Sequence, residues 1–133
     1  MRFRIVLFVF FGLYSCTQPE RNCKKFQTGS FEFSSISSNG DTLKTFFTRT
    51  NKIEVDYFNN ETDSSYVNWV SECECVLKKV SPKNLSEKKP IQMKILSTSE
   101  NQYVFEYSFV GDSENKNRGK AKKLTDSIIV KGY

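Results

Sequence analysis

The chain has 133 residues and a formal net charge of +5, with 20 lysines and arginines, 15 aspartates and glutamates, and no histidine. Twelve Phe, six Tyr and one Trp against six Gly and three Pro argue against a disordered chain and favour a single aromatic-packed domain. The absence of histidine removes the commonest general base and metal ligand, and no glycine-rich phosphate loop is present. We therefore expect no catalytic residues, no metal site and no cofactor.

The first 16 residues have the pattern of a bacterial lipoprotein export signal. Arg2 and Arg4 form a positive segment, residues 5–13 form an apolar run, and Cys16 follows Ser15. The run is too short to span a bilayer comfortably, which favours a cleaved signal over a permanent transmembrane helix. We expect a signal peptide over residues 1–15, a lipid on Cys16 and a location in the bacterial cell envelope, at the outer membrane. An ordinary secretory signal is the alternative.

The remaining cysteines follow the expected cleavage point. Residues 16–25 are predicted to be the lipidated cysteine and a polar tether, and residues 26–133 a single β domain. Cys73 and Cys75 are two apart in a strand-like stretch, so their side chains point the same way and do not suit a mutual bond. One of them is expected to pair with Cys23 in an oxidising compartment. We prefer Cys23 with Cys73 and leave Cys75 as a buried thiol, although Cys75 could take the place of Cys73.

Apolar and polar residues alternate through most of the remaining chain, which predicts seven or eight short strands. Asn39-Gly40-Asp41 is a strong hairpin signal, and Ser81-Pro82 predicts one short helical turn near residues 82–89. Residues 111–119 are expected to form a polar loop before the last strand. The predicted strands lie near residues 29–37, 42–50, 53–57, 66–70, 73–80, 91–95, 103–110 and 120–131.

These strands predict an all-β fold. We expect an antiparallel meander that closes into a small up-and-down barrel or half-barrel of lipocalin-like architecture, because an open sheet would leave long edges that can pair with other chains. A two-sheet β-sandwich is the alternative.

The strand near residues 103–109 has one wholly aromatic face. With Trp69, this face is expected to fill the core of the barrel, and the alternative is that it lines a ligand cavity. Its residues are Tyr103, Phe105, Tyr107 and Phe109. Glu54 and Asp56 lie on one side of the third strand and could couple as a carboxyl pair, but we assign them to the outer, solvated face of the sheet.

A basic run covers residues 116–123. We predict a flexible loop there that either engages an anionic lipid or an acidic partner, or is simply a solvated hairpin. Its cations are Lys116, Arg118, Lys120, Lys122 and Lys123. Two tripeptides that begin at Asp41 and Asp126 match a short pattern for O-glycosylation, at Thr42 and Ser127 respectively.

Between Cys23 and Phe109, the chain resembles a family of small uncharacterised lipoproteins of bacterial envelopes. Some members of that family carry the automatic name "DNA topoisomerase IV", yet this sequence has no ATP-binding motif, and we expect no nucleic-acid partner. The resemblance implies that Cys73 is a disulfide cysteine and that Cys75 departs from the family pattern. It rests on four segments: Phe31-Glu32-Phe33, Trp69-Val70-Ser71-Glu72-Cys73, Ser81-Pro82-Lys83-Asn84 and Phe105-Glu106-Tyr107-Ser108-Phe109-Val110-Gly111-Asp112.

Two functions are compatible with these features. We expect a non-catalytic, lipid-anchored protein that binds another envelope component, and the alternative is a carrier of a small apolar ligand inside the barrel. A continuous cavity lined by the aromatic face and Trp69 would favour the carrier, whereas a filled interior with an exposed patch would favour the partner.

Overall fold

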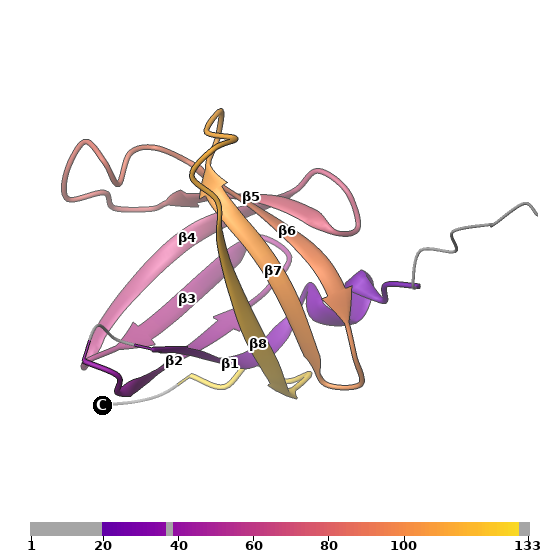
Figure 1. The fold of residues 1–133 in the computed structure, drawn as a ribbon. Coiled ribbons are helices and arrows are strands. Elements are labelled where there is room, and N and C mark those ends of the chain that lie inside the picture. The colour runs from indigo at the N-terminus through magenta and orange to yellow at the C-terminus, as the bar shows by residue number, and fades with distance from the viewer. Residues whose placement is uncertain (1–19, 37–38, 131–133) are drawn as a thin grey trace, which may run out of the picture.

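The computed structural model describes residues 20–36 and 39–130, so the expected signal peptide and Cys16 lie outside the described residues. A short 3-10 helix, η1 (Cys23–Phe26), precedes eight strands (Figure 1). The strands are β1 (Gly29–Ile36), β2 (Thr42–Arg49), β3 (Ile53–Phe58), β4 (Glu61–Trp69), β5 (Glu74–Lys79), β6 (Ile91–Thr98), β7 (Gln102–Phe109) and β8 (Asn117–Thr125).

The strands form a closed up-and-down barrel. Each strand pairs antiparallel with the next, and β8 pairs with β1, so the sheet leaves no free edge. This confirms the predicted barrel and excludes the sandwich. The register of the strand pairs places inward-facing residues of neighbouring strands opposite one another. Phe31 of β1 lies opposite Phe47 of β2, which in turn lies opposite Asp56 of β3.

The predicted loop after β7 and the predicted helical turn differ from the structure. Strand β8 begins at Asn117, so the loop after β7 is shorter than expected. Residues 82–89 form a hydrogen-bonded turn, and η1 is the only helix in the described part of the chain. Side chains compete with a helix in the turn: the Glu87 amide donates to Asn84 Oδ1 (2.9 Å), and the Lys83 amide donates to the Glu87 carboxylate (2.8 Å).

Helix η1 covers one end of the barrel. Its Phe26 is fully buried and lies 5.2 Å, centroid to centroid, from the ring of Tyr103. The disulfide between Cys23 and Cys73 joins η1 to the connection between β4 and β5, as predicted, and Cys75 is a buried free thiol. The predicted tether is therefore folded from Cys23 onward. No helix within residues 20–36 and 39–130 is long and apolar enough to cross a membrane.

The two ends of the barrel differ. The connections β2–β3, β4–β5 and β6–β7 lie with η1 at what we call the closed end, where the Asn22 amide donates to Thr98 Oγ1 (2.9 Å). The other four connections form the opposite end, the mouth, which includes the long loops after β5 and β7 (Figure 1).

Aromatic rings fill the closed half of the barrel. Phe31 stacks on Phe47 at 4.9 Å between centroids and meets the edge of Tyr103 at 5.9 Å. Each such buried ring contributes about 1.5–3 kcal/mol through the area it removes from water. Farther toward the mouth, Gly119 of β8 leaves room for two more rings: a Cβ there would lie 2.6 Å from the ring of Phe33 and 2.7 Å from that of Phe105.

The chain after β8 crosses the outer wall. The Ser30 hydroxyl donates to the carbonyl of Ser127 (2.7 Å) and accepts from the Ile129 amide (2.9 Å). Ser30 is fully buried as a result. The predicted last strand to residue 131 therefore ends at Thr125, and the residues after it form a strap over β1.

Loss of the disulfide should destabilise the barrel. The bridge spans 50 residues, so the chain-entropy relation gives about 4 kcal/mol for the variant Cys23→Ala/Cys73→Ala. Urea unfolding measures the difference. The parent under reducing conditions should match the variant, whereas Cys75→Ala should remain sensitive to reductant. Peptide mapping that joined Cys23 to Cys75 would contradict the pairing.

Candidate functional site

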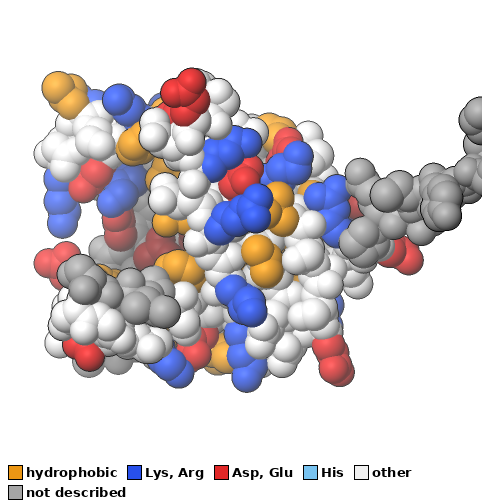
Figure 2. Space-filling view, in the orientation of Figure 1, with side chains coloured by type: hydrophobic (Ala, Val, Ile, Leu, Met, Phe, Trp, Pro, Cys, Tyr) orange, Lys and Arg blue, Asp and Glu red, His pale blue; other side chains and the backbone are white. Residues whose placement is uncertain are grey.

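The half of the barrel toward the mouth is hollow. An interior cavity of about 160 Å³ adjoins a hollow of about 290 Å³ at the mouth. Glu54, Asp56, Leu77 and Ile91 line both. Figure 2 shows the opening at the left of the molecule, with acidic side chains within it. The cavity has further walls of Phe33, Thr45, Phe47, Arg49, Met93, Tyr103, Phe105 and Tyr107.

The predicted aromatic face points into the barrel. Neighbouring rings of Tyr103, Phe105 and Tyr107 lie 5.5 and 5.8 Å apart and line the cavity. Phe109, on the same face, lies in the mouth and is 38% exposed. Trp69 packs against the core but does not line the cavity. It therefore belongs with the aromatic face as part of the core and not as part of the cavity wall.

The carboxyl groups of β3 face the interior, so their predicted assignment to the outer face is wrong. Glu54 is buried, and Asp56 lies opposite Phe47 on one side and Asp63 on the other. The apolar side chains that alternate with them face outward. That outer face is itself partly covered, since Tyr57 packs on Phe46 with ring centroids 5.7 Å apart.

Arg49 and Glu54 form a buried ion pair near the closed end, with side chains 4% and 9% exposed. The guanidinium lies over the rings of Phe47 (5.1 Å), Phe31 (5.5 Å) and Trp69 (5.8 Å). Burial is the largest single influence and by itself would lower the pKa of Arg49. Glu54, through its charge and its hydrogen bond, acts together with Tyr103 and Cys75 to raise that pKa instead. Arg49 therefore stays charged.

A second ion-pair group lies at the mouth. The ammonium of Lys79 pairs with Asp63 and lies 3.7 Å from Glu87. A hydrogen bond to Asp63 is the largest cause of the raised pKa of Lys79. Lys79 is thus held by acidic side chains on two sides.

Asp56 lies between these two groups without a partner of its own. Among the described residues, its carboxyl makes no ion pair and no hydrogen bond. Burial and then the charge of Glu54 raise its pKa to about 8, although Arg49 and Lys79 oppose the change. Burial therefore favours the protonated form of Asp56 at neutral pH.

The basic run does not form the predicted loop. From Asn117 onward it belongs to β8, whose alternation sends Lys120 and Lys122 outward and Lys123 inward. The buried ammonium of Lys123 contacts the Lys25 carbonyl at 2.5 Å and Asp126 at 2.5 Å. Its cations therefore do not form one surface.

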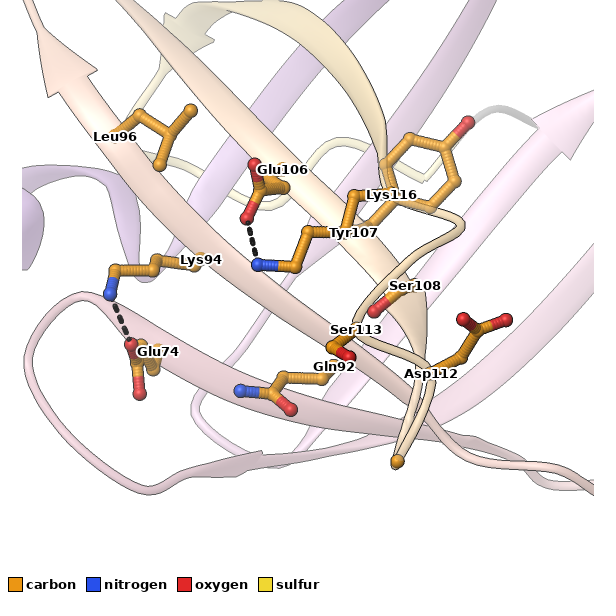
Figure 3. A pocket seen from close by; sticks show the side chains of 11 residues that line it. Glu74, Gln92, Lys94, Leu96, Glu106, Tyr107, Ser108, Asp112, Ser113 and Lys116 are labelled. Carbon is orange, nitrogen blue, oxygen red and sulfur yellow. Dashed lines mark ion pairs between the residues drawn. The ribbon is translucent and has the colours of Figure 1, made fainter.

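Lys116 lines a polar groove on the outer wall, and Arg118 shares its partner Glu106. Their cationic groups lie 3.0 and 3.6 Å from the carboxylate of Glu106, whose pKa is lowered chiefly by the hydrogen bond from Lys116. Figure 3 shows this groove, where Lys94 also pairs with Glu74 at 2.9 Å. Each carboxylate in these pairs already has a cationic partner, so the groove is a weaker candidate than the cavity.

The remaining predicted positions lie away from the cavity. Thr42 at the start of β2 and Ser127 in the strap are both exposed. In the described part of the chain, no three His, Cys, Asp or Glu side chains are arranged to hold a metal ion.

Comparison of the chain with protein-family models, with curated proteins and with solved structures finds no match.

The raised pKa of Asp56 should make stability depend on pH. Folded Asp56 keeps its proton to about pH 8, whereas the ordinary value is 3.8, so the folded state binds more protons in between. Stability should therefore fall as pH rises from about 4 to 8. Relative to Asp56→Asn, the free energy of unfolding of the parent should fall by up to about 1.4 kcal/mol per pH unit.

Chemical denaturation at pH 5, 6 and 7 measures this slope. Asp41→Asn, the same change in an exposed turn, should follow the parent. Parallel profiles for the parent and Asp56→Asn would show that Asp56 titrates in its ordinary range.

Proposed function

We propose that this chain is a lipid-anchored protein of the bacterial envelope whose barrel carries a small ligand with an apolar body. The observation that carries the proposal is the cavity lined by Tyr103, Phe105 and Tyr107 and open at the mouth. Ligand sites are typically concave and mostly apolar, with a few polar groups that fix orientation. Here the polar groups are the charged side chains where the cavity meets the mouth.

Cavity size sets the size of the ligand. The interior volume of about 160 Å³ is close to that of an engineered cavity of about 150 Å³ that admits benzene. An apolar group of about six carbon atoms therefore fits the interior. A polar head and any further atoms would occupy the hollow of about 290 Å³ at the mouth.

The lipid anchor is proposed from the pattern of residues 1–16. The position of Cys23 supports a simple arrangement, because the disulfide holds it at the closed end. A lipid on Cys16 would tether the barrel by that end. The mouth would then point away from the anchoring membrane, free to exchange ligand.

Docking to another envelope component is a second candidate function, and exposed apolar side chains around the mouth favour it. Leu85 in the loop after β5 is 78% exposed, and Val110 after β7 is 49% exposed. Phe58 at the end of β3 adds to this rim. Isolated exposed apolar residues are common, so the cavity is the stronger observation.

A tryptophan inside the barrel should abolish ligand binding. Leu77 lines both the cavity and the mouth, so Leu77→Trp fills the space that the ligand needs. Calorimetric titration with 1-hexanol should give saturable binding to the parent and at least a tenfold loss in the variant. Leu124→Trp, on the exposed face of β8, is the control and should bind as the parent does. Equal binding by all three would exclude the interior as the site.

Replacing the expected lipidation site should release the protein from the membrane. Cys16→Ser should lose incorporation of labelled fatty acid and leave the membrane fraction, because a serine has no thiol to form the thioether. Thr17→Ser, one residue later, should keep both properties. A Cys16→Ser protein that retained label and membrane association would refute the anchor.

A further inference from the structure

We propose that the cavity selects ligands that carry a single ammonium group on an apolar body, with Asp56 as the residue that binds the ammonium. This inference names the ligand class of the cavity and so rests on the proposed function. It starts from the balance of charges along the cavity and mouth.

The side chains that line the cavity and the mouth include one more acidic group than basic groups. The lining contains three cations and four carboxyl groups: Arg49, Lys79 and Lys89, with Glu54, Asp56, Asp63 and Glu87. Arg49 pairs with Glu54, and Lys79 lies between two acidic side chains. The ammonium of Lys89 lies 5.6 Å from the centroid of the Phe109 ring. The carboxyl group without an ion pair among these described residues is that of Asp56.

The position of Asp56 fits a head group. It lines both the interior cavity and the hollow at the mouth, so it marks the junction between them. A ligand that buries about six carbon atoms against Phe105 and Tyr107 would hold its head group at this junction. The charge of the ligand's head group would therefore interact first with Asp56.

The aromatic walls also suit a cation. Ring faces attract cations electrostatically, and this effect strengthens where water is excluded. Arg49 already lies over Phe31 and Phe47, and Lys89 over Phe109. Phe105 and Tyr107 also line the cavity. Within the described residues, no lysine or arginine lies over either ring, so both ring faces can receive a cation of the ligand.

Other head groups fit less well. A carboxylate or phosphate would be repelled by Asp63 and, wherever Asp56 is ionised, by Asp56 as well. The nearest cations, Arg49 and Lys79, are already held by acidic partners. A neutral alcohol would fit the cavity but would leave Asp56 to be neutralised by a proton. An ammonium can replace that proton.

Binding therefore exchanges one cation for another. The ligand enters as an ammonium, the Asp56 carboxyl gives up its proton to solvent, and a carboxylate–ammonium pair forms. Because the pKa of Asp56 is about 8, amine binding below pH 8 should release close to one proton. The charged groups that face Asp56 are Arg49 of β2, Glu54 of β3, Asp63 of β4, and Lys79 of β5, with Glu87 beyond it in the mouth.

Three ligands with one chain length separate these cases: hexylamine, 1-hexanol and hexanoate, titrated calorimetrically into the full chain. Hexylamine should bind at least tenfold more tightly than 1-hexanol at pH 8, and hexanoate should bind most weakly. Affinity for hexylamine should rise up to tenfold per unit between pH 6 and 8 and then level off. Titration in buffers of different ionisation enthalpy should show release of nearly one proton at pH 7.

Variants identify the residue. Asp56→Asn should bind 1-hexanol as the parent does, lose the preference for hexylamine and release no proton. Asp41→Asn, in an exposed turn, should keep the parent's preference. Circular dichroism checks folding, and the proton release in the parent tests the inference even if Asp56→Asn does not fold.

The outcomes distinguish the two proposals. Equal affinities for hexylamine and 1-hexanol, or tightest binding of hexanoate, would overturn the ammonium assignment and leave the carrier function standing. Failure of all three ligands to bind would overturn both.

Discussion

The buried pair of Arg49 and Glu54 constrains the whole barrel, because neither charge can leave the interior without isolating the other. A buried pair often adds little stability over an apolar replacement, but loss of one partner costs about 3–5 kcal/mol. The guanidinium also touches the Phe26 carbonyl of η1 and the Tyr103 hydroxyl of β7, each at 3.4 Å. A one-residue slip of β3 would turn Glu54 outward and leave the Arg49 charge buried without its partner. Because Asp56 lies on the same face of β3 as Glu54, the ion pair also keeps Asp56 inside the barrel.

Most strands and turns were predictable because their signals are local. Alternation and the Asn39-Gly40-Asp41 turn located them. Cysteine geometry argued against a bond between Cys73 and Cys75 but left either of them open as the partner of Cys23. The inner face of β3 was missed because alternation separates two faces without saying which is buried. A signal was present: the two-residue Asn59-Asn60 turn, with positive φ at both residues, places Asp56 opposite Asp63. Because side chains alternate along β4, an inward Val67 places Asp63 inside as well, and Asp56 opposite it follows.

The cavity was harder to foresee than the fold, because it depends on whether side-chain volumes fill the barrel. The aromatic face of β7 suggested a packed interior, and in the closed half that is correct. Gly119 lets the rings of Phe33 and Phe105 approach β8, and Ala121, opposite Phe33, is fully buried. How such rings pack depends on contacts between strands far apart in sequence, which a period-two pattern does not encode. The basic run was predicted as one loop, but it continues into β8. The alternation of that strand turns Lys123 inward and Lys120 and Lys122 outward.

The disulfide also determines how a mechanical load would enter the fold. A pull on the segment before Cys23 passes through the covalent bridge to Cys73, in the connection between β4 and β5. Residues 24–28 and the β1–β8 seam are bypassed, so tension does not peel the first strand from the last. A barrel held in this way could be dragged by its N-terminal segment while its interior kept its shape.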